Sequence, residues 1–95
     1  MRIRGAVVVI TGASSGIGKA TALAFAKQGA SLTLAARRKS ALEETVAACE
    51  ALGSPATAVE VDVTDPEAVD GLADAAVRRF GRIDVWVNNA GVTMF

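Results

Sequence analysis

The stretch AVVVITGASSGIG, residues 6–18, joins a continuous apolar run to a segment with three glycines and two serines. The run Ala6–Ile10 is short and rich in β-branched residues, which is typical of a strand that helices bury on both faces. Small and apolar residues then recur at helical spacing up to the stop signal Gly29: Ile17, Ala20, Thr21, Ala24 and Phe25. Thr11–Gly18 is therefore predicted to be the turn between a buried strand and a helix.

The alternation of strand and helix patterns continues along the chain. Further strands are predicted at residues 31–36 (SLTLAA), 56–61 and 84–88 (DVWVN). Ser40, three residues before Glu43, forms a capping-box pattern and predicts a helix from there through Leu52. Asp65 and the proline and glutamate after it predict the cap and first turn of a third helix, which ends at Phe80 before a glycine.

Strands that alternate with helices indicate an α/β fold, a parallel sheet wrapped by helices. With right-handed crossovers, the pattern favours the first half of a doubly wound, Rossmann-type sheet with strand order 3-2-1-4. The carboxyl ends of the first and fourth strands then border the ligand crevice, and TGASSGIG (residues 11–18) and NNAG (residues 88–91) fall at those ends. We expect residues 1–95 to form a single dinucleotide-binding segment, without repeats or linkers.

Composition excludes several classes of function. Ten basic and ten acidic residues balance, so the net charge gives no general electrostatic attraction to nucleic acid or to an anionic membrane. There is no histidine and only one cysteine, Cys49, which excludes an internal disulfide and a Cys/His zinc site, and we predict no metal site. Cys49 is predicted to be a core residue. No secretion signal and no apolar run of about 18 residues is present, which favours a cytoplasmic setting without a membrane span.

The glycine-rich turn has three interpretations. A phosphate cradle suits it, since a helix N-terminus offers unpaired N–H groups and a favourable dipole, and glycines allow the backbone to approach a pyrophosphate. The spacing of Gly12, Gly16 and Gly18 differs from G-x-G-x-x-G, and a P-loop would need a hydroxyl where Ala20 stands. Simple turn chemistry remains an alternative from these eight residues alone.

A hydrolase nucleophile turn is the third interpretation. Gly12–Gly16 matches G-x-S-x-G, with Ser14 as the nucleophile. A serine needs a general base, usually histidine, and this chain has none. The interpretation would therefore hold only if a partner segment supplied the base.

Three motifs together resemble the short-chain dehydrogenase/reductase family. Residues 11–18 resemble its TGxxxGxG, Asp62-Val63-Thr64 its acidic residue after the third strand, and residues 88–91 its NNAG. Their order and spacing also match, over essentially the whole chain. The resemblance implies an oxidoreductase that binds a nicotinamide dinucleotide and transfers hydride to or from a small alcohol or carbonyl substrate.

The end of the second strand favours NADP over NAD. An acid about 20 residues past the glycines would hold the ribose 2′-OH of NAD, whereas an arginine accommodates the 2′-phosphate of NADP. Ala36 occupies that place and is followed by Arg37 and Arg38. Arg37 is the first choice for the phosphate contact because it is nearer the strand, and Ser14 could add a hydroxyl.

The resemblance also implies the other cofactor contacts. Asp62 would accept from the adenine amino group and the Val63 backbone would lie beside the ring, although Asp62 could instead only cap a turn. Asn88 is expected to tie neighbouring strands together, and Trp86 and Phe80 to pack in the core. The remaining implied contacts are the pyrophosphate and adenosine-ribose residues Gly12, Ser14, Ser15, Gly16, Ile17 and Gly18, and, toward the nicotinamide ribose, Asn89, Ala90 and Gly91.

The family's catalytic tyrosine, lysine and serine would all lie beyond the position of Phe95, and the chain has no tyrosine. We therefore assign no catalytic residue and expect weak binding of NADPH without turnover. The chain resembles the amino-terminal part of a longer enzyme, and a sheet that ends at a fourth strand would expose an edge that favours a homo-oligomer. The alternative is a self-standing nucleotide-binding or assembly module without catalytic chemistry.

Overall fold

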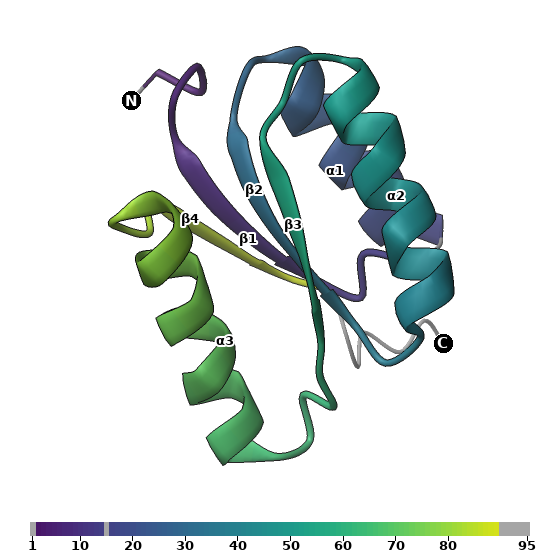
Figure 1. Ribbon diagram of the computed structural model, residues 1–95, viewed down its shortest axis with the longest axis vertical. Helices are drawn as coiled ribbons and strands as arrows, with labels where there is room; N and C mark the ends of the chain where they lie inside the picture. Colours follow the sequence, from purple (N-terminus) through teal and green to yellow (C-terminus); the bar gives the residue numbers. More distant parts are fainter. Residues whose placement is uncertain (1, 15, 90–95) are drawn as a thin grey trace.

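The computed structural model describes residues 2–14 and 16–89. Its centre is a parallel sheet in which the strands follow the order β3-β2-β1-β4, as predicted from the sequence (Figure 1). The strands are β1 (Val7–Thr11), β2 (Ser31–Ala36), β3 (Ala56–Glu60) and β4 (Val85–Asn88). The reversal of winding between β1 and β4 places their carboxyl ends side by side.

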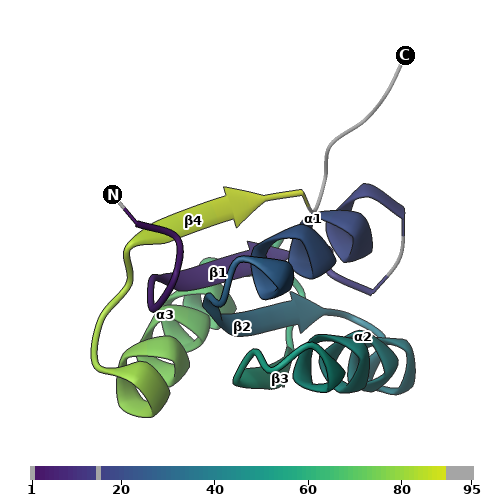
Figure 2. The ribbon, with the colours of Figure 1, turned by 90° about the horizontal axis from the view of Figure 1, so that it is seen from above.

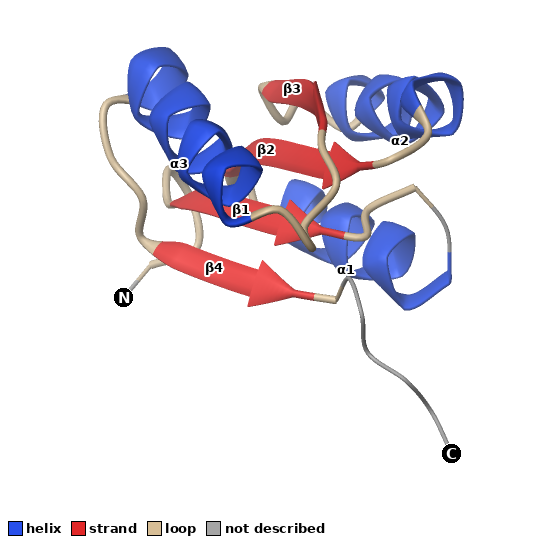
Figure 3. Cartoon of the chain, turned by 90° about the horizontal axis from the view of Figure 1, so that it is seen from below, coloured by secondary structure: helices blue, strands red, loops and turns tan. Residues whose placement is uncertain are grey.

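Helices cover both faces of this sheet. Two of them, α1 (Gly16–Lys27) and α2 (Lys39–Ala51), pack on one face, and α3 (Pro66–Phe80) packs on the other (Figures 2 and 3). No helix among residues 2–14 and 16–89 combines the length and the apolar character that crossing a membrane requires.

The interior strand β1 explains the continuous apolar run. All five of its residues are buried. Val8 and Ile10 pack toward α1 and α2, whereas Val9 packs toward α3 with Leu72. Because successive side chains of a strand point to opposite faces, a strand covered on both faces must be apolar at every position.

Strand ends differ from the predicted ranges by one residue. The first strand begins at Val7 because the Ala6 N–H donates to the Ile3 carbonyl in a turn, at 2.9 Å. The fourth begins at Val85, after Asp84, whose carboxylate accepts from the Val7 N–H. The third ends at Glu60, although the Val61 N–H still donates to the Ala36 carbonyl at 3.0 Å.

Helix caps agree with the prediction for α3 and disagree for α2. Asp65 caps α3 by accepting from the Glu67 N–H at 3.0 Å, and Gly81 ends that helix with a left-handed φ of 88°. The capping box predicted at Ser40 is wrong, because α2 begins one residue earlier with Arg38 as an extended N-cap that makes no side-chain cap bond. Core packing through Leu42 fixes where α2 lies, so a local cap motif did not decide its start.

Other predicted core residues lie on both faces. Cys49 is fully buried on α2, as expected. Trp86 packs with the α3 cluster, again as expected, and is half-buried. Phe80 is half-buried at the end of α3, where the Arg79 guanidinium lies 5.0 Å from its ring centroid.

Candidate nucleotide-binding site

The turn after β1 takes backbone angles that favour glycine. Gly12 and Gly16 have φ values of 62° and 58°, in the left-handed region. The Ala13 N–H between them donates to the Ala35 carbonyl at 3.0 Å and ties the turn to the end of β2. A Cβ on Gly16 would meet no atom within 4 Å, so open space adjoins this backbone. Ala13 is thus tied to β2, and the backbone at Gly16 lies beside open space.

Gly18 has a different role, because it allows α1 to pack against the turn. A Cβ on Gly18 would overlap the carbonyl oxygen of Gly12. The first turn of α1 therefore lies directly against the glycine loop. This close approach directs the helix N-terminus and its unpaired N–H groups toward the carboxyl end of the sheet.

The surroundings of the α1 N-terminus suit an anion and an apolar contact. The first turn of α1 carries no acidic residue that would repel a phosphate. The Ile17 side chain is 63% exposed at the mouth of the turn, which is unusual for isoleucine. Ser14 is half-buried, and Ser15 lies outside the described residues. A ligand with phosphate and apolar parts would use these features.

Thr11 joins β1 to the end of β4 and has no role in the sequence-based prediction. Its hydroxyl donates to Asn88 Oδ1 at 2.8 Å and accepts from the Asn89 N–H at 3.1 Å. Asn88 thus ties the strands together, as expected. The predicted 3-2-1-4 order already paired the first and fourth strands, and their register, which places Thr11 opposite Asn88, would have indicated this contact.

The Asn89 side-chain amide has no hydrogen-bond partner within residues 2–14 and 16–89. Its Nδ2 is buried and makes no hydrogen bond among the described residues. A buried donor without an acceptor is costly, and a ligand oxygen would relieve that cost. The predicted site residues Ala90 and Gly91, which follow Asn89, lie outside the described residues.

The carboxyl ends of β2 and β3 bring the charge of Arg37 close to Asp62. Ala36 pairs with Glu60 in the sheet, and Arg37 and Arg38 follow as exposed residues. The Asp62 carboxylate accepts from the Thr64 N–H at 3.0 Å and from its hydroxyl at 2.7 Å. The backbone N–H of Thr64 lowers the pKa of Asp62, its hydroxyl lowers that pKa further, and the Arg37 charge adds to the effect.

Asp62 therefore makes the turn-capping contacts that were the alternative to a role at adenine. Both of these bonds end on Oδ1, one of its two carboxylate oxygens. Val63, predicted to lie beside the adenine ring, is half-buried in the same turn. Within residues 2–14 and 16–89, no group of three or more His, Cys, Asp and Glu side chains could hold a metal ion.

The fold defines an α/β protein of the Rossmann type, with a candidate nucleotide site at the carboxyl ends of β1 and β4. The glycine turn fits a pyrophosphate, and the unpartnered Asn89 amide fits a ligand at the end of β4. The family model described as short chain dehydrogenase matches residues 6–95. The chain belongs to the short-chain dehydrogenase family.

Known proteins agree with this family. The chain is 50% identical over 91 residues to 11-beta-hydroxysteroid dehydrogenase A of Sesamum indicum, an alignment that covers 95% of this chain and 26% of that protein. A hydroxysteroid dehydrogenase structure from Escherichia coli superposes with a TM-score of 0.91 at 38% identity, covering 96% of this chain and 39% of that one. The structure of NAD+-bound xylitol dehydrogenase superposes with a TM-score of 0.91 at 41% identity, covering 97% of this chain and 35% of that chain. The chain thus spans between a quarter and two fifths of the length of these relatives.

Proposed function

We propose that this chain is the NADP(H)-binding part of an oxidoreductase that transfers hydride between the nicotinamide and an alcohol or carbonyl carbon. Membership of the short-chain dehydrogenase family supports this reaction class. The main structural support for a nucleotide site is the glycine turn, which adjoins open space and packs against the α1 N-terminus. Residues 1–95 would form a single nucleotide-binding unit, and a homo-oligomer remains part of the proposal.

Each part of the dinucleotide would meet a different element. The N–H groups of the turn and of the α1 N-terminus, with the Ser14 hydroxyl, would bind the pyrophosphate. The exposed Ile17 side chain would lie against the adenosine ribose. Asn89 would donate its unpartnered Nδ2 hydrogen to the ribose on the nicotinamide side. The Asn89 amide, which has no hydrogen-bond partner among the described residues, would thereby gain one.

Arg37 is proposed to select the 2′-phosphate of NADP. It follows β2 directly, it is exposed, and its charge is close enough to Asp62 to lower that pKa. A guanidinium binds a phosphate through two parallel hydrogen bonds, worth about 1.5–3 kcal/mol for a charged pair. The related xylitol dehydrogenase binds NAD+, and the titration below distinguishes the two cofactors for this chain.

The chemistry of the bound group is hydride transfer at the nicotinamide ring. These 95 residues include no tyrosine and no histidine that could relay the accompanying proton. Their own contribution is to bind the dinucleotide and to orient it along the carboxyl edge of the sheet. We therefore expect these residues by themselves to bind NADPH weakly and not to turn over a carbonyl substrate.

The cofactor proposal is tested by titrating the chain and its Arg37→Ala variant with NADPH and with NADH. We expect the substitution to weaken NADPH binding about tenfold or more and to change NADH binding less than about twofold, since only NADPH carries the 2′-phosphate. Arg78→Ala, at an exposed arginine in the last turn of α3, is the matched control and should change neither affinity. Equal losses for both nucleotides would contradict phosphate selection by Arg37.

A further inference from the structure

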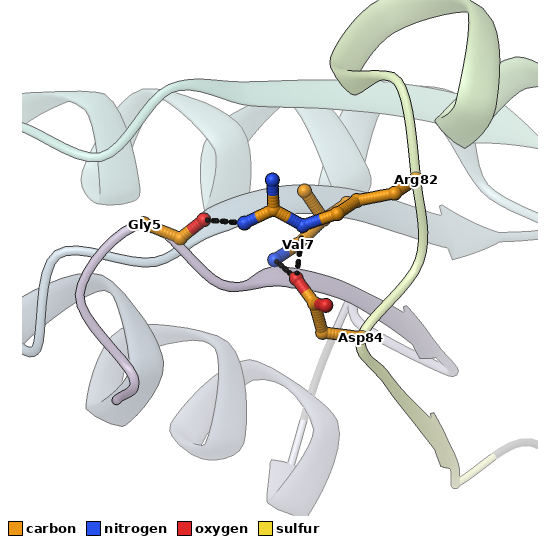
Figure 4. Close-up of polar contacts among 4 residues, drawn as sticks. All are labelled: Gly5, Val7, Arg82 and Asp84. Atoms are coloured by element: carbon orange, nitrogen blue, oxygen red, sulfur yellow. Dashed lines mark hydrogen bonds and ion pairs between the residues drawn. The ribbon is translucent and has the colours of Figure 1, made fainter. Parts of the chain in front are cut away.

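Side-chain contacts join β1 and β4 at their amino ends, far from the glycine turn. The Asp84 carboxylate accepts from the Val7 N–H and from Arg82 Nε, each at 2.8 Å through Oδ2 (Figure 4). Arg82 also donates from Nη2 to the Gly5 carbonyl at 3.1 Å. These four residues, Gly5, Val7, Arg82 and Asp84, are called the latch below.

The latch acts on a short strand at one side of the described sheet, next to a backbone bond from the Asp84 N–H to the Val7 carbonyl at 2.9 Å. β4 has four residues and, among the described strands, pairs only with β1. Its apolar residues Val85, Trp86 and Val87 are each half-buried, so burial specifies its register less strongly than it does for β1. A slip of one residue would exchange the faces of every β4 side chain. Contacts that fix one end of β4 therefore bear on its whole register.

The strength of the latch lies in its geometry more than in the ion pair. The Arg82 side chain is 61% exposed and that of Asp84 26%, and an exposed pair of this kind contributes little by itself. Each charged group, however, also binds a backbone group of the segment around β1: Asp84 binds the Val7 N–H and Arg82 the Gly5 carbonyl. Two charge-assisted bonds to fixed backbone groups define one position of residues 82–84.

The opposite end of β4 carries the nucleotide-site contacts. Its register places Asn88 opposite Thr11, where the Thr11 hydroxyl binds Asn88 Oδ1 and the Asn89 N–H. An extended strand rises about 3.3 Å per residue, so Asn88 lies roughly 13 Å along the strand from Asp84. A shift at Asp84 would be carried along this short extended segment to Asn88 and Asn89.

We propose that Arg82 and Asp84 are positioning residues for the nucleotide site, although they lie at the other end of the sheet. The latch holds β4 in the register that brings Asn88 and Asn89 to Thr11, and nucleotide affinity falls when the latch is opened. This inference rests on the proposed nucleotide-binding function. It differs from a purely stabilising role, in which folded variants would bind the nucleotide as well as the unchanged chain does.

Two variants open the latch in different ways. Asp84→Asn removes the negative charge at nearly constant shape, and Arg82→Ala removes the guanidinium but retains the Asp84 bond to Val7, which makes it the safer variant for folding. Arg82→Lys restores the charge and should recover part of the lost function. The matched controls are Asp70→Asn and Arg78→Ala, exposed residues of α3.

Three measurements are made on variants that urea titration shows to be folded. Hydrogen exchange of the Asn89 amide reports the bond to Thr11, and emission of Trp86, the only tryptophan, reports the packing of β4. NADPH titration reports the site. We expect Asp84→Asn and Arg82→Ala to exchange the Asn89 amide faster, to shift the Trp86 emission and to weaken NADPH binding about three- to tenfold, with smaller losses in Arg82→Lys.

The outcomes separate the latch from the proposed function. Asn89 exchange and Trp86 emission equal to those of the controls would contradict the latch itself. Faster exchange with unchanged NADPH affinity would contradict its coupling to the site and leave the proposed function standing. Failure of the unchanged chain to bind NADPH would contradict the proposed function and, with it, the coupling, whereas the two β4 readouts would still measure the latch.

Discussion

At the scale of single residues, the three glycines of the turn after β1 meet different steric demands. Gly12 and Gly16 adopt positive φ angles, which a Cβ would strain, and Gly16 also leaves open space beside its backbone. Gly18 lies within helix α1, where its missing Cβ lets the helix touch the Gly12 carbonyl. The motif thus encodes one backbone path and one helix contact, and both bring N–H groups to the edge of the sheet.

We predict that Gly18→Ala destabilises the chain by about 1 kcal/mol or more. An added methyl group in a close-packed contact costs about 1–3 kcal/mol, and direct overlap with backbone atoms puts the cost in the upper half of that range, whereas alanine returns at most about 1 kcal/mol through its helix propensity. The clash dominates because the group it meets is the backbone of Gly12, which cannot rotate away. Urea unfolding followed by circular dichroism measures the difference.

Gly71→Ala supplies the matched control for this prediction. Gly71 lies inside α3, and a Cβ there would meet nothing within 4 Å. The same substitution should therefore stabilise the chain by about 0.5–1 kcal/mol. If both variants gained stability, the close contact between α1 and the turn would be refuted.

Residue roles could be predicted from the sequence only where a motif dictates backbone geometry. The glycines were assigned to a turn at the end of a strand because their spacing demands it, and the structure confirms that turn. For Asp62 the sequence allows both an adenine contact and a turn cap, since both uses place an acid at the same point of the chain. Asp84 was missed as a contact because its partner, the Val7 N–H, is 77 residues away.

At the scale of elements, α2 and α3 begin in physically different ways. Asp65 accepts from the Glu67 N–H, and Pro66 follows Asp65, so residues next to the helix start determine where α3 begins. The start of α2 has no side-chain cap, and Arg38 is its extended N-cap residue. Buried Leu42 and Cys49 hold α2 against the sheet instead. Local signals therefore located α3 well and misplaced the start of α2.

We predict that Asp65→Ala and Ser40→Ala have different effects on stability. Asp65→Ala removes the α3 cap and should lower the free energy of unfolding by about 0.5–2 kcal/mol. Ser40→Ala should change it by less than about 0.5 kcal/mol, because Ser40 is an exposed residue within α2 and does not cap it. Urea unfolding of the two variants measures both changes, and Asp65→Asn should recover most of the loss. A large loss in Ser40→Ala would restore the capping box.

At the scale of the whole molecule, the order of the strands could be predicted from the sequence, whereas the side-chain contacts that join β4 to the segment around β1 could not. Alternating strand and helix patterns with right-handed crossovers leave few topologies, and the order β3-β2-β1-β4 is among them. Charged contacts such as those of Arg82 and Asp84 join segments far apart in the chain and follow no periodicity. These contacts can be recognised only from the folded sheet, which brings Val7 and Asp84 together.

Two carboxylates at opposite ends of the sheet should make the stability of the whole chain depend on acid. The Val7 N–H and then Arg82 lower the pKa of Asp84 below its ordinary value of 3.8, as Thr64 does for Asp62. A lowered pKa in the folded state means that stability is present above the unfolded-state pKa and is lost as the pH falls through the folded-state value. Both contributions should therefore be intact at neutral pH and decline below about pH 4.

We predict that Asp84→Asn and Asp62→Asn are less stable than the unchanged chain at pH 7 and approach its stability in acid. The difference narrows because protonation removes from the unchanged chain the same negative charge that each substitution removes. Urea midpoints measured in steps from pH 7 to about pH 3 give the two curves, and Asp70→Asn, on the exposed surface of α3, serves as the control. A gap for Asp84→Asn that stayed constant across this range would contradict the assignment of this stability to the negative charge of Asp84.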